Sequence, residues 1–300
     1  MNKTLNDQPV ISVKGLTQQY GNGRVIYSDL SFEVPRGRIL GLLGKNGTGK
    51  TTTINILMGY LKPRQGECRI FGESITELSP ATRARIALLI EGHVQYSFMT
   101  IAQIEKFYSR FYPRWNRDAY YELMKKLKVS PSQAISSMSC GQRSQVALGL
   151  ILAQNADLLV LDDFSLGLDP GYRRLFVDYL REYAKAEDKT VFMTSHIIQD
   201  LERLIDDCII LDYGRILTQM PVDDLLRDFR RYTFRTDSPT LPADVDLINP
   251  GRIRNEVEVY SFKDADYVRN LLDRGNVDYS DFSLTPMSLE DAFIGLTGKY

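Results

Sequence analysis

The sequence predicts an α/β fold: a buried parallel sheet with helices, preceded by an antiparallel β patch and followed by a small α+β domain. Three observations predict this fold. Apolar runs of four or five residues, typical of strands covered on both faces, alternate with helical patterns in the middle of the chain. Short strands separated by glycine and proline breaks come before them. A mixed series of strands and helices comes after residue 227.

The composition supports a folded chain of two parts and excludes several classes of protein. Its 300 residues, 43% hydrophobic and 25% charged, are typical of a globular protein with one large or two ordinary domains. A net charge of −1 gives no positive surplus to hold a nucleic acid, so no nucleic-acid partner is expected. No stretch reaches the ~18 apolar residues of a spanning helix. The polar N-terminus and three widely spaced cysteines favour a reducing cytosol over secretion.

The first half of the chain passes from paired strands into helices. The antiparallel patch is predicted from short strands at Val10–Val13, Val25–Ile26 and Leu30–Val34. The apolar run Ile39–Leu43 then meets a glycine-rich turn that opens a helix from Lys50 to Tyr60. A helical subdomain is expected at about residues 92–155, with two amphipathic helices between Ile101 and Lys128, joined across Pro113, and a third from about Gly141 to Gln154.

The second half alternates buried strands with helices and then changes character. The alternating elements are Leu158–Leu161, Tyr172–Ala186, Thr190–Thr194, Ile197–Leu204 and Cys208–Leu211. A βαβ-like series follows, with strands at Tyr232–Arg235, Glu256–Phe262 and Val277–Leu284 and helices at Asp264–Arg274 and Leu289–Leu296. From residue 231 onward, the chain contains eight Lys and Arg residues and twelve Asp and Glu residues, so this segment is acidic. We therefore divide the chain into domains at 1–227 and 228–300.

A glycine-rich loop carries the first chemical signal. Residues 44–51, GKNGTGKT, fit the spacing GxxxxGK[ST] between a predicted strand and a predicted helix. Glycines let successive amides turn toward anionic oxygens, Lys50 adds a mobile cation, and the Thr51 hydroxyl is a ligand for Mg²⁺. An ordinary glycine-rich turn is the alternative. The pattern predicts a nucleotide-phosphate site built from Gly44, Lys45, Asn46, Gly47, Thr48, Gly49, Lys50, Thr51 and Thr52.

A pair of acids carries the second signal. Asp162 and Asp163 end the apolar strand Leu158–Leu161, at the sheet edge where α/β proteins place ligands. We expect Asp162 to hold Mg²⁺ through its waters and Asp163 to face the attacking water at the γ-phosphate. The alternative is that these acids only cap the next helix.

Between these two elements, Ser139-Cys140-Gly141-Gln142 begins an apolar helix. This arrangement resembles the LSGGQ signature of ABC ATPases, and the resemblance spans residues 10 to 217. It implies a P-loop ATPase core that binds ATP with Mg²⁺. It also implies that Ser139, Gly141 and Gln142 act on the ATP of a second copy of the chain, so that two chains sandwich two ATP molecules.

Further positions are similar to that family. Tyr20 resembles the aromatic residue that stacks on adenine, with a strand-end core residue as the alternative. Glu91 stands where the family has a glutamine that touches Mg²⁺ and the water, so it is a candidate for catalysis and metal binding. Asp169 resembles the D-loop aspartate that contacts the opposite subunit. His196 resembles the switch histidine that holds the γ-phosphate, whereas His93 is interpreted as a surface residue.

The sequence departs from the family at several of these positions. Asp163 replaces the usual Glu, which withdraws the carboxylate by about 1 Å and predicts slow turnover. Cys140 replaces a signature glycine where backbone must approach phosphate closely. Glu91 replaces Gln, with Gln95 as an alternative polar sensor. Phe164 and Leu166 replace Pro and Ser and are expected to make the adjoining seam more apolar.

The chain most resembles ATPase subunits of bacterial exporters whose membrane subunit is a separate chain, on its ending (287–300) and on the segment 111–115. The resemblance implies a permease partner and a cytoplasmic location on the inner face of the membrane. The alternatives are a slow-hydrolysing, nucleotide-sensing ABC protein and a soluble ABC ATPase. The aromatic run in the helical insert is interpreted as the core of that subdomain; alternatively, part of it, with Tyr96 and Phe98, forms a groove for the membrane subunit. The run is Phe107, Tyr108, Phe111, Tyr112 and Trp115.

Overall fold

The computed structural model describes residues 8–21, 23–90, 96–164 and 168–298, and the chain divides into two compact units, Met1–Gln219 and Met220–Tyr300. The division precedes helix α8 (Val222–Asp228), whereas the sequence placed it between residues 227 and 228, within the last turn of this helix. Helix α8 packs against α10 (Leu289–Thr297), which explains why it groups with the second unit. None of the helices in the described ranges has the length and apolar character needed to span a bilayer.

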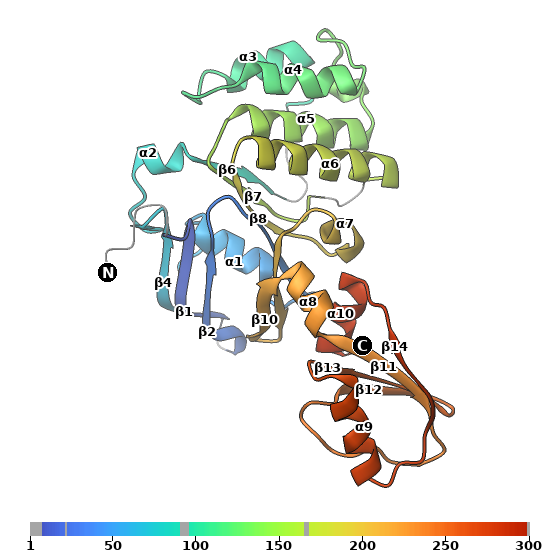
Figure 1. Ribbon diagram of the computed structural model, residues 1–300. Helices are drawn as coiled ribbons and strands as arrows, with labels where there is room; N and C mark the ends of the chain where they lie inside the picture. Colours follow the sequence, from blue (N-terminus) through green and yellow to red (C-terminus); the bar gives the residue numbers. More distant parts are fainter. Residues whose placement is uncertain (1–7, 22, 91–95, 165–167, 299–300) are drawn as a thin grey trace. The chain divides into compact units, whose positions relative to one another are not determined.

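Two sheets build the first unit (Figure 1). The antiparallel sheet has the order β2-β1-β4-β5, formed by β1 (Ile11–Tyr20), β2 (Arg24–Val34), β4 (Gln65–Ile70) and β5 (Glu73–Ser74). The second sheet has the order β10-β9-β3-β8-β7-β6, and the neighbours from β9 to β6 run parallel. Its strands are β3 (Ile39–Gly44), β6 (Ile86–Leu89), β7 (Leu158–Leu161), β8 (Thr190–Thr194), β9 (Asp207–Asp212) and β10 (Arg215–Pro221). The predicted α/β class is confirmed.

Strands β1 and β2 are longer than the sequence predicted. The β1–β2 pairing contains irregularities between Val13 and Leu16 and again near Gln18, and Gly15 lies there with φ +60°. A glycine accommodates this left-handed backbone without a Cβ clash. The strand therefore continues through a segment whose alternation of apolar and polar residues is broken.

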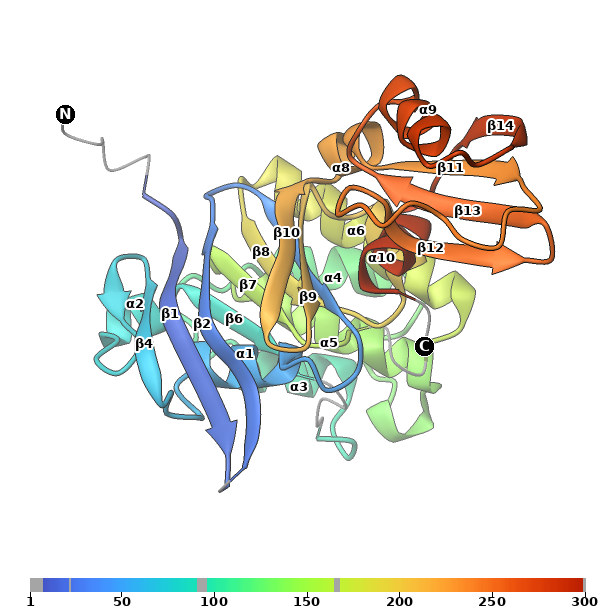
Figure 2. The same cartoon turned by 90° about the horizontal axis from the view of Figure 1, so that it is seen from below.

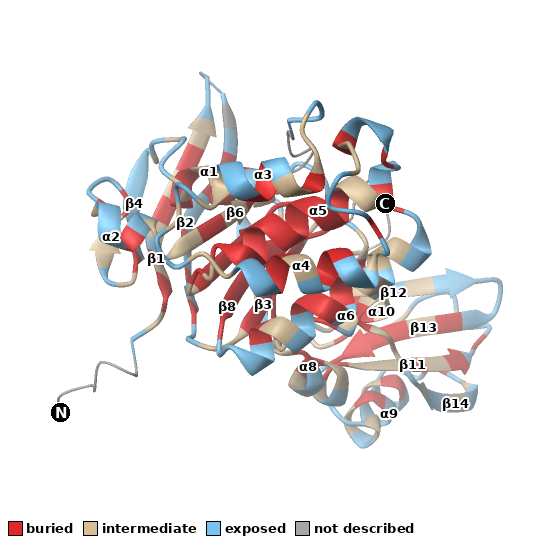
Figure 3. Ribbon diagram, turned by 90° about the horizontal axis from the view of Figure 1, so that it is seen from above, coloured by how far each residue is buried: buried red, intermediate tan, exposed pale blue. Residues whose placement is uncertain are grey.

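Helices cover the sheets of the first unit. Helix α1 (Lys50–Leu57) contributes Ile54, Ile56 and Leu57 to a core that also holds Leu16 and Phe32 of the antiparallel sheet and apolar residues of β3, β7, β8 and β9. Helix α5 (Cys140–Ala153) is buried along most of its length (Figure 3) and packs against α4 (Arg117–Lys126) and α6 (Pro170–Ala186). The other helical elements of this unit are α2 (Pro80–Arg83), α3 (Ile101–Tyr108), η2 (Ile135–Ser137) and α7 (Ile198–Glu202).

The helical subdomain has a different core from the predicted one. None of the five aromatic residues of the run is buried; Phe111 is 65% exposed. The interpretation of this run as core is therefore wrong. Helix α3 instead turns Ile101 and Ile104 inward, and α4 adds Tyr120 and Leu123. Phe107 is the last residue but one of α3 and Phe111 lies three residues past its end, and both side chains are exposed outside this core.

The second unit is a four-stranded antiparallel sheet in the order β12-β13-β11-β14. Both β13 and β14 run antiparallel to β11, so they are parallel to each other and are joined through α9 as a split βαβ unit. Helices α9 and α10 lie on opposite faces of this sheet (Figure 2). The elements are β11 (Arg230–Arg235), β12 (Ile248–Ile253), β13 (Glu256–Ser261), α9 (Ala265–Arg274) and β14 (Ser280–Thr285).

Candidate functional site

The glycine-rich loop joins β3 to α1 and holds its backbone by close packing. Gly49 precedes the helix with φ +102°, and a Cβ there would lie 2.5 Å from Ile26 Cγ2 and 2.6 Å from Tyr27 Cε1. A side chain at this position would therefore collide with β2. No side chain caps α1, so the amides of its first turn face the loop, an arrangement that suits an anion.

Lys50 lies inside this loop. Its Nζ donates to the carbonyl oxygens of Gly44 at 2.7 Å and Lys45 at 3.1 Å. Burial lowers the pKa of its ammonium group, while the carboxylates of Asp163 and Asp162 oppose that shift. The cation is thus held within the curve of the loop, where phosphate oxygens would meet it.

The two acids emerge from β7 beside the loop. Asp162 is 4% exposed, and the Thr51 hydroxyl donates to its Oδ1 over 3.3 Å. Asp163 adopts a left-handed backbone with φ +45°, and both of its carboxylate oxygens lie 2.7 Å from His196 Nδ1. A carboxylate only accepts, so Nδ1 is the donor in this contact. His196 Nε2, for which the described residues supply no partner, therefore accepts a hydrogen bond in the neutral ring and donates one only when the ring is an imidazolium.

A single cavity of about 310 Å³ gathers these groups. Its lining contains both predicted phosphate-site elements and the histidine from the end of β8. It also contains Ile26 and Thr194, which belong to neither of the predicted motifs. The lining residues are Tyr20, Ile26, Asn46, Gly47, Gly49, Lys50, Thr51, Thr52, Asp162, Asp163, Thr194 and His196.

Comparison with known proteins agrees with this geometry. Residues 27–165 match the family model described as ABC transporter. The bacitracin transport ATP-binding protein BcrA of Bacillus licheniformis is 27% identical over 96% of this chain and 97% of its own length. The chain carries an ABC transporter ATP-binding domain.

Two further comparisons extend this result. The Nod factor export ATP-binding protein I of Ralstonia nicotianae is 28% identical to this chain, and the match covers 98% of this chain and 96% of that protein. A solved structure of the ATP-binding subunit of an ABC transporter is 27% identical with a TM-score of 0.63 and covers 73% of this chain and 92% of that chain. The ABC ATP-binding family hydrolyses ATP.

The donor set of this ABC domain fits Mg²⁺. The Thr51 hydroxyl and the Asp162 carboxylate are hard oxygen donors placed 3.3 Å apart. Within the described ranges, no three His, Cys, Asp or Glu side chains cluster into a metal cage. Mg²⁺ usually binds one or two protein oxygens together with phosphates and water, so this sparse set suits a metal that arrives with a nucleotide.

Tyr20 lies at the end of β1 on the rim of the cavity. It is 45% exposed, and its hydroxyl is 3.2 Å from Thr52 Oγ1. The alternative assignment of Tyr20 to the core is therefore wrong. An exposed ring at the edge of the nucleotide pocket of an ABC domain offers a face for a base.

The signature segment lies apart from this cavity. Ser139 caps α5 by accepting the Gln142 N–H, and the Gln142 side chain accepts the Ser139 N–H in return. Ser139 and Cys140 are exposed, whereas Gly141 is packed so closely that a Cβ would lie 2.3 Å from the Tyr172 ring. Among the described lining residues of the cavity, none comes from 139–142.

The remaining predicted residues have mixed outcomes. Glu91, His93 and Gln95 lie outside the described residues, as does Leu166. Asp169 caps α6 by accepting the N–H groups of Gly171 and Tyr172, and it does not line the cavity. Phe164 is 4% exposed and stacks on Phe176 with ring centroids 4.7 Å apart, so the expectation that it makes a surface seam more apolar is wrong.

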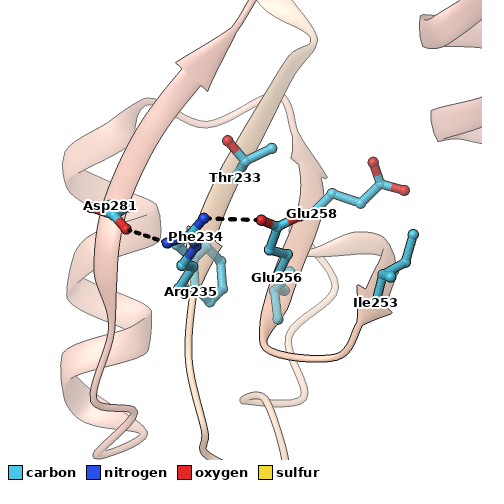
Figure 4. A pocket seen from close by; sticks show the side chains of 9 residues that line it. Thr233, Phe234, Arg235, Ile253, Glu256, Glu258 and Asp281 are labelled. Carbon is cyan, nitrogen blue, oxygen red and sulfur yellow. Dashed lines mark hydrogen bonds and ion pairs between the residues drawn. The ribbon is translucent and has the colours of Figure 1, made fainter.

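A second cavity, of about 430 Å³, lies on one face of the sheet in the second unit (Figure 4). Arg235 pairs with Glu256 at 3.2 Å and with Asp281 at 3.5 Å across neighbouring strands. Such cross-strand ion pairs are usual on the solvated face of an antiparallel sheet. The residues that could handle phosphate lie instead in the first unit.

Proposed function

We propose that this chain is the ATP-hydrolysing subunit of an ABC exporter that acts as a dimer on a separate membrane permease. One observation carries the proposal: Lys50, Thr51, Asp162, Asp163 and His196 line a single cavity, while none of the signature residues 139–142 is among its described lining residues. Lys50 would neutralise phosphate charge, Thr51 and Asp162 would hold Mg²⁺, and Asp163 would accept the proton of the attacking water. Mg²⁺ would supply charge stabilisation at the β- and γ-phosphates.

The exposed signature segment supports a dimer. A helix N-terminus with Ser139 ahead of it suits a γ-phosphate, but this helix does not open into the cavity of its own chain. A second copy would bring its own P-loop to this segment, with Asp169 at the same seam. Two copies would then share two composite ATP sites.

A mixing experiment tests the composite site. In Lys50→Ala both sites of a homodimer lack the lysine, and in Ser139→Arg both sites have a blocked signature. A mixed dimer has one site that carries both defects and one intact site, so mixing should restore hydrolysis. An equimolar mixture forms half mixed dimers with one of two sites intact, which predicts about a quarter of the wild-type rate if the sites act independently. A mixture no more active than its components would refute the shared site.

An aromatic surface supports the permease partner. Phe98 is 75% exposed, and the rings of Tyr96, Phe107 and Phe111 follow in edge-to-face contact, with centroids 5.2 Å apart at each step. The buried Glu105 carboxylate accepts the Trp115 Nε1–H over 2.9 Å, which fixes the loop after Phe111. A contiguous exposed patch of large apolar side chains is typical of an interaction site, and an amphipathic helix of a permease would cover it.

Co-purification of a tagged chain with its polytopic membrane partner tests this surface. Replacing Phe98 and Phe111 with Ser should abolish recovery of the permease and leave the basal ATPase rate within about twofold, because neither residue lines the ATP cavity. Leu284→Ser is the matched control, since Leu284 is 58% exposed on the second unit. Full recovery by the double variant would exclude this surface.

A nucleotide sensor that barely hydrolyses ATP is the second candidate. It is favoured by the shortened acid at Asp163 and by Cys140, which is exposed at the first helical position of the signature. Hydrolysis coupled to a permease should accelerate when the membrane partner is added, whereas a sensor should bind ATP without this acceleration. The rate of phosphate release with and without the permease separates the two.

A further inference from the structure

Strand β8 places Thr194 beside the two acids. Strands β7 and β8 are parallel with Leu161 opposite Met193, so the following residues, Asp162 and Thr194, are neighbours at the carboxyl edge of the sheet. Thr194 is only 1% exposed. Because a buried hydroxyl is cut off from water, it must find its hydrogen-bond partners within the protein.

The Thr194 hydroxyl makes one hydrogen bond to each acidic residue. Its Oγ1 donates to Asp162 Oδ1 over 2.6 Å and accepts the backbone N–H of Asp163 over 3.1 Å. A hydroxyl has a single proton to donate and lone pairs to accept with, so the two bonds are compatible. Together they fix both the hydroxyl and the two residues that it bridges.

Asp163 depends on this contact because of its backbone. Residues other than glycine seldom adopt the left-handed region where Asp163 lies, and a partner for its N–H helps to keep it there. The carboxylate of the same residue is held by His196, two positions beyond Thr194. Two residues at the carboxyl end of β8 therefore hold Asp163: Thr194 binds its backbone N–H, and His196 binds its carboxylate.

We propose that Thr194 is a positioning residue for ATP hydrolysis, whose hydroxyl orients the Asp162 carboxylate toward Mg²⁺ and fixes the peptide that carries Asp163. This inference rests on the proposed function. Without the hydroxyl, the bond that the described residues still offer the Asp162 carboxylate is the longer one from Thr51, and the Asp163 N–H loses the Thr194 oxygen. Metal affinity and turnover should fall together, while the P-loop contacts of the nucleotide should persist.

Three variants separate positioning from folding. Thr194→Val keeps the shape of the side chain and removes the hydroxyl, whereas Thr194→Ser keeps the hydroxyl. Thr190→Val is the matched control: Thr190 is also 1% exposed and its hydroxyl accepts the Gly37 N–H over 2.9 Å, at the opposite end of β8. Thermal unfolding of each variant shows how much stability is lost when either buried hydroxyl, that of Thr194 or that of Thr190, is removed.

The first readout is metal-dependent binding without turnover. With a non-hydrolysable ATP analogue, Thr194→Val should raise the Mg²⁺ concentration for half-maximal binding by about tenfold, the scale on which residues behind a metal ligand act. Affinity for the analogue in EDTA should stay within about twofold. The second readout is turnover: kcat of Thr194→Val should fall about 10²-fold. Thr194→Ser and Thr190→Val should stay within about threefold of wild type in both measurements.

Two results would overturn the role of Thr194. One is a Thr194→Val protein with wild-type metal dependence and turnover. The other is a Thr194→Ser protein that loses as much as the valine variant, because the serine retains the hydroxyl; this comparison remains decisive even if the valine variant does not fold. A different result would show that the proposed function itself is wrong: Lys50→Ala and Asp163→Asn would then hydrolyse ATP at the wild-type rate. In that case the Mg²⁺ dependence of analogue binding would still test whether Thr194 positions Asp162.

Discussion

Lengthening Asp163 by one methylene tests whether the reach of its carboxylate limits hydrolysis. The backbone of Asp163 is fixed at φ +45° and its carboxylate lies against His196, so side-chain length decides how far the carboxylate extends into the cavity. Asp163→Glu moves it outward by about 1 Å, and a misplacement of that size costs about 10²-fold in rate, or ~2.7 kcal/mol of barrier. We expect Asp163→Glu to raise kcat by about 10- to 100-fold.

Asp163→Asn is the companion change. The asparagine oxygen still accepts a hydrogen bond from His196, but the amide accepts no proton from water, so kcat should fall by about 10²-fold or more. The KM for ATP should stay within about twofold, because the P-loop is unchanged. Phosphate release at saturating MgATP measures the rates, and thermal unfolding shows that each variant is folded. Equal rates for all three proteins would remove Asp163 from the mechanism, and a glutamate variant slower than wild type would refute the argument from reach.

Three other changes have defined outcomes. Tyr20→Ala should weaken ATP binding by about tenfold and Tyr20→Phe should restore it, because stacking needs the ring and not the hydroxyl; titration with a fluorescent nucleotide measures this, and a Phe variant as weak as Ala contradicts it. Cys140→Gly should strengthen the ATP-dependent dimer severalfold by removing an exposed side chain at the seam, as read by size-exclusion chromatography; an unchanged dimer would count against that position. Asp157→Asn should lower the free energy of unfolding by about 1–2 kcal/mol at neutral pH, because Asp157 pairs with Arg85 at 2.6 Å and Arg114 at 2.7 Å and is partly exposed. Although burial opposes it, the two guanidinium groups hold the pKa of Asp157 below its usual range, so the stabilisation is present above the ordinary carboxyl pKa and is lost as pH falls through the folded value; denaturant unfolding of both proteins should converge in acid.

Elements with a dense apolar pattern were predictable from the sequence. Strand β7 is an unbroken apolar run and β8 has three apolar residues between two threonines; their observed bounds, Leu158–Leu161 and Thr190–Thr194, equal the predicted ones. Strands β4 and β12 have no such pattern: β4 is largely exposed, and β12 contains a proline and a glycine beside an irregular pairing with β13. Such strands are defined by their partners, which a local pattern does not reveal.

The candidate site likewise contains residues that a local sequence pattern reveals and residues that it does not reveal. The P-loop and Asp162-Asp163 are contiguous motifs, so local sequence reveals their chemistry. Thr194 has no motif of its own and becomes visible only through the register of β7 and β8, which sets it beside Asp162. Phe107 is exposed because Ile101 and Ile104 occupy the inward face of α3, and Phe111 lies beyond the end of that helix; aromatic spacing alone decided neither position.

The close packing at Gly49 makes the nucleotide pocket sensitive to substitutions in the neighbouring antiparallel sheet. There is no room for even one carbon atom between Gly49 and the side chains of Ile26 and Tyr27 on β2. The antiparallel sheet therefore packs directly against the phosphate loop and limits where its backbone can lie. Core substitutions in that hairpin would shift the loop and alter nucleotide affinity although they touch no ligand. Core substitutions intended to stabilise the protein should therefore avoid the β1–β2 hairpin. They are better placed on the face of the parallel sheet that is turned away from the antiparallel sheet.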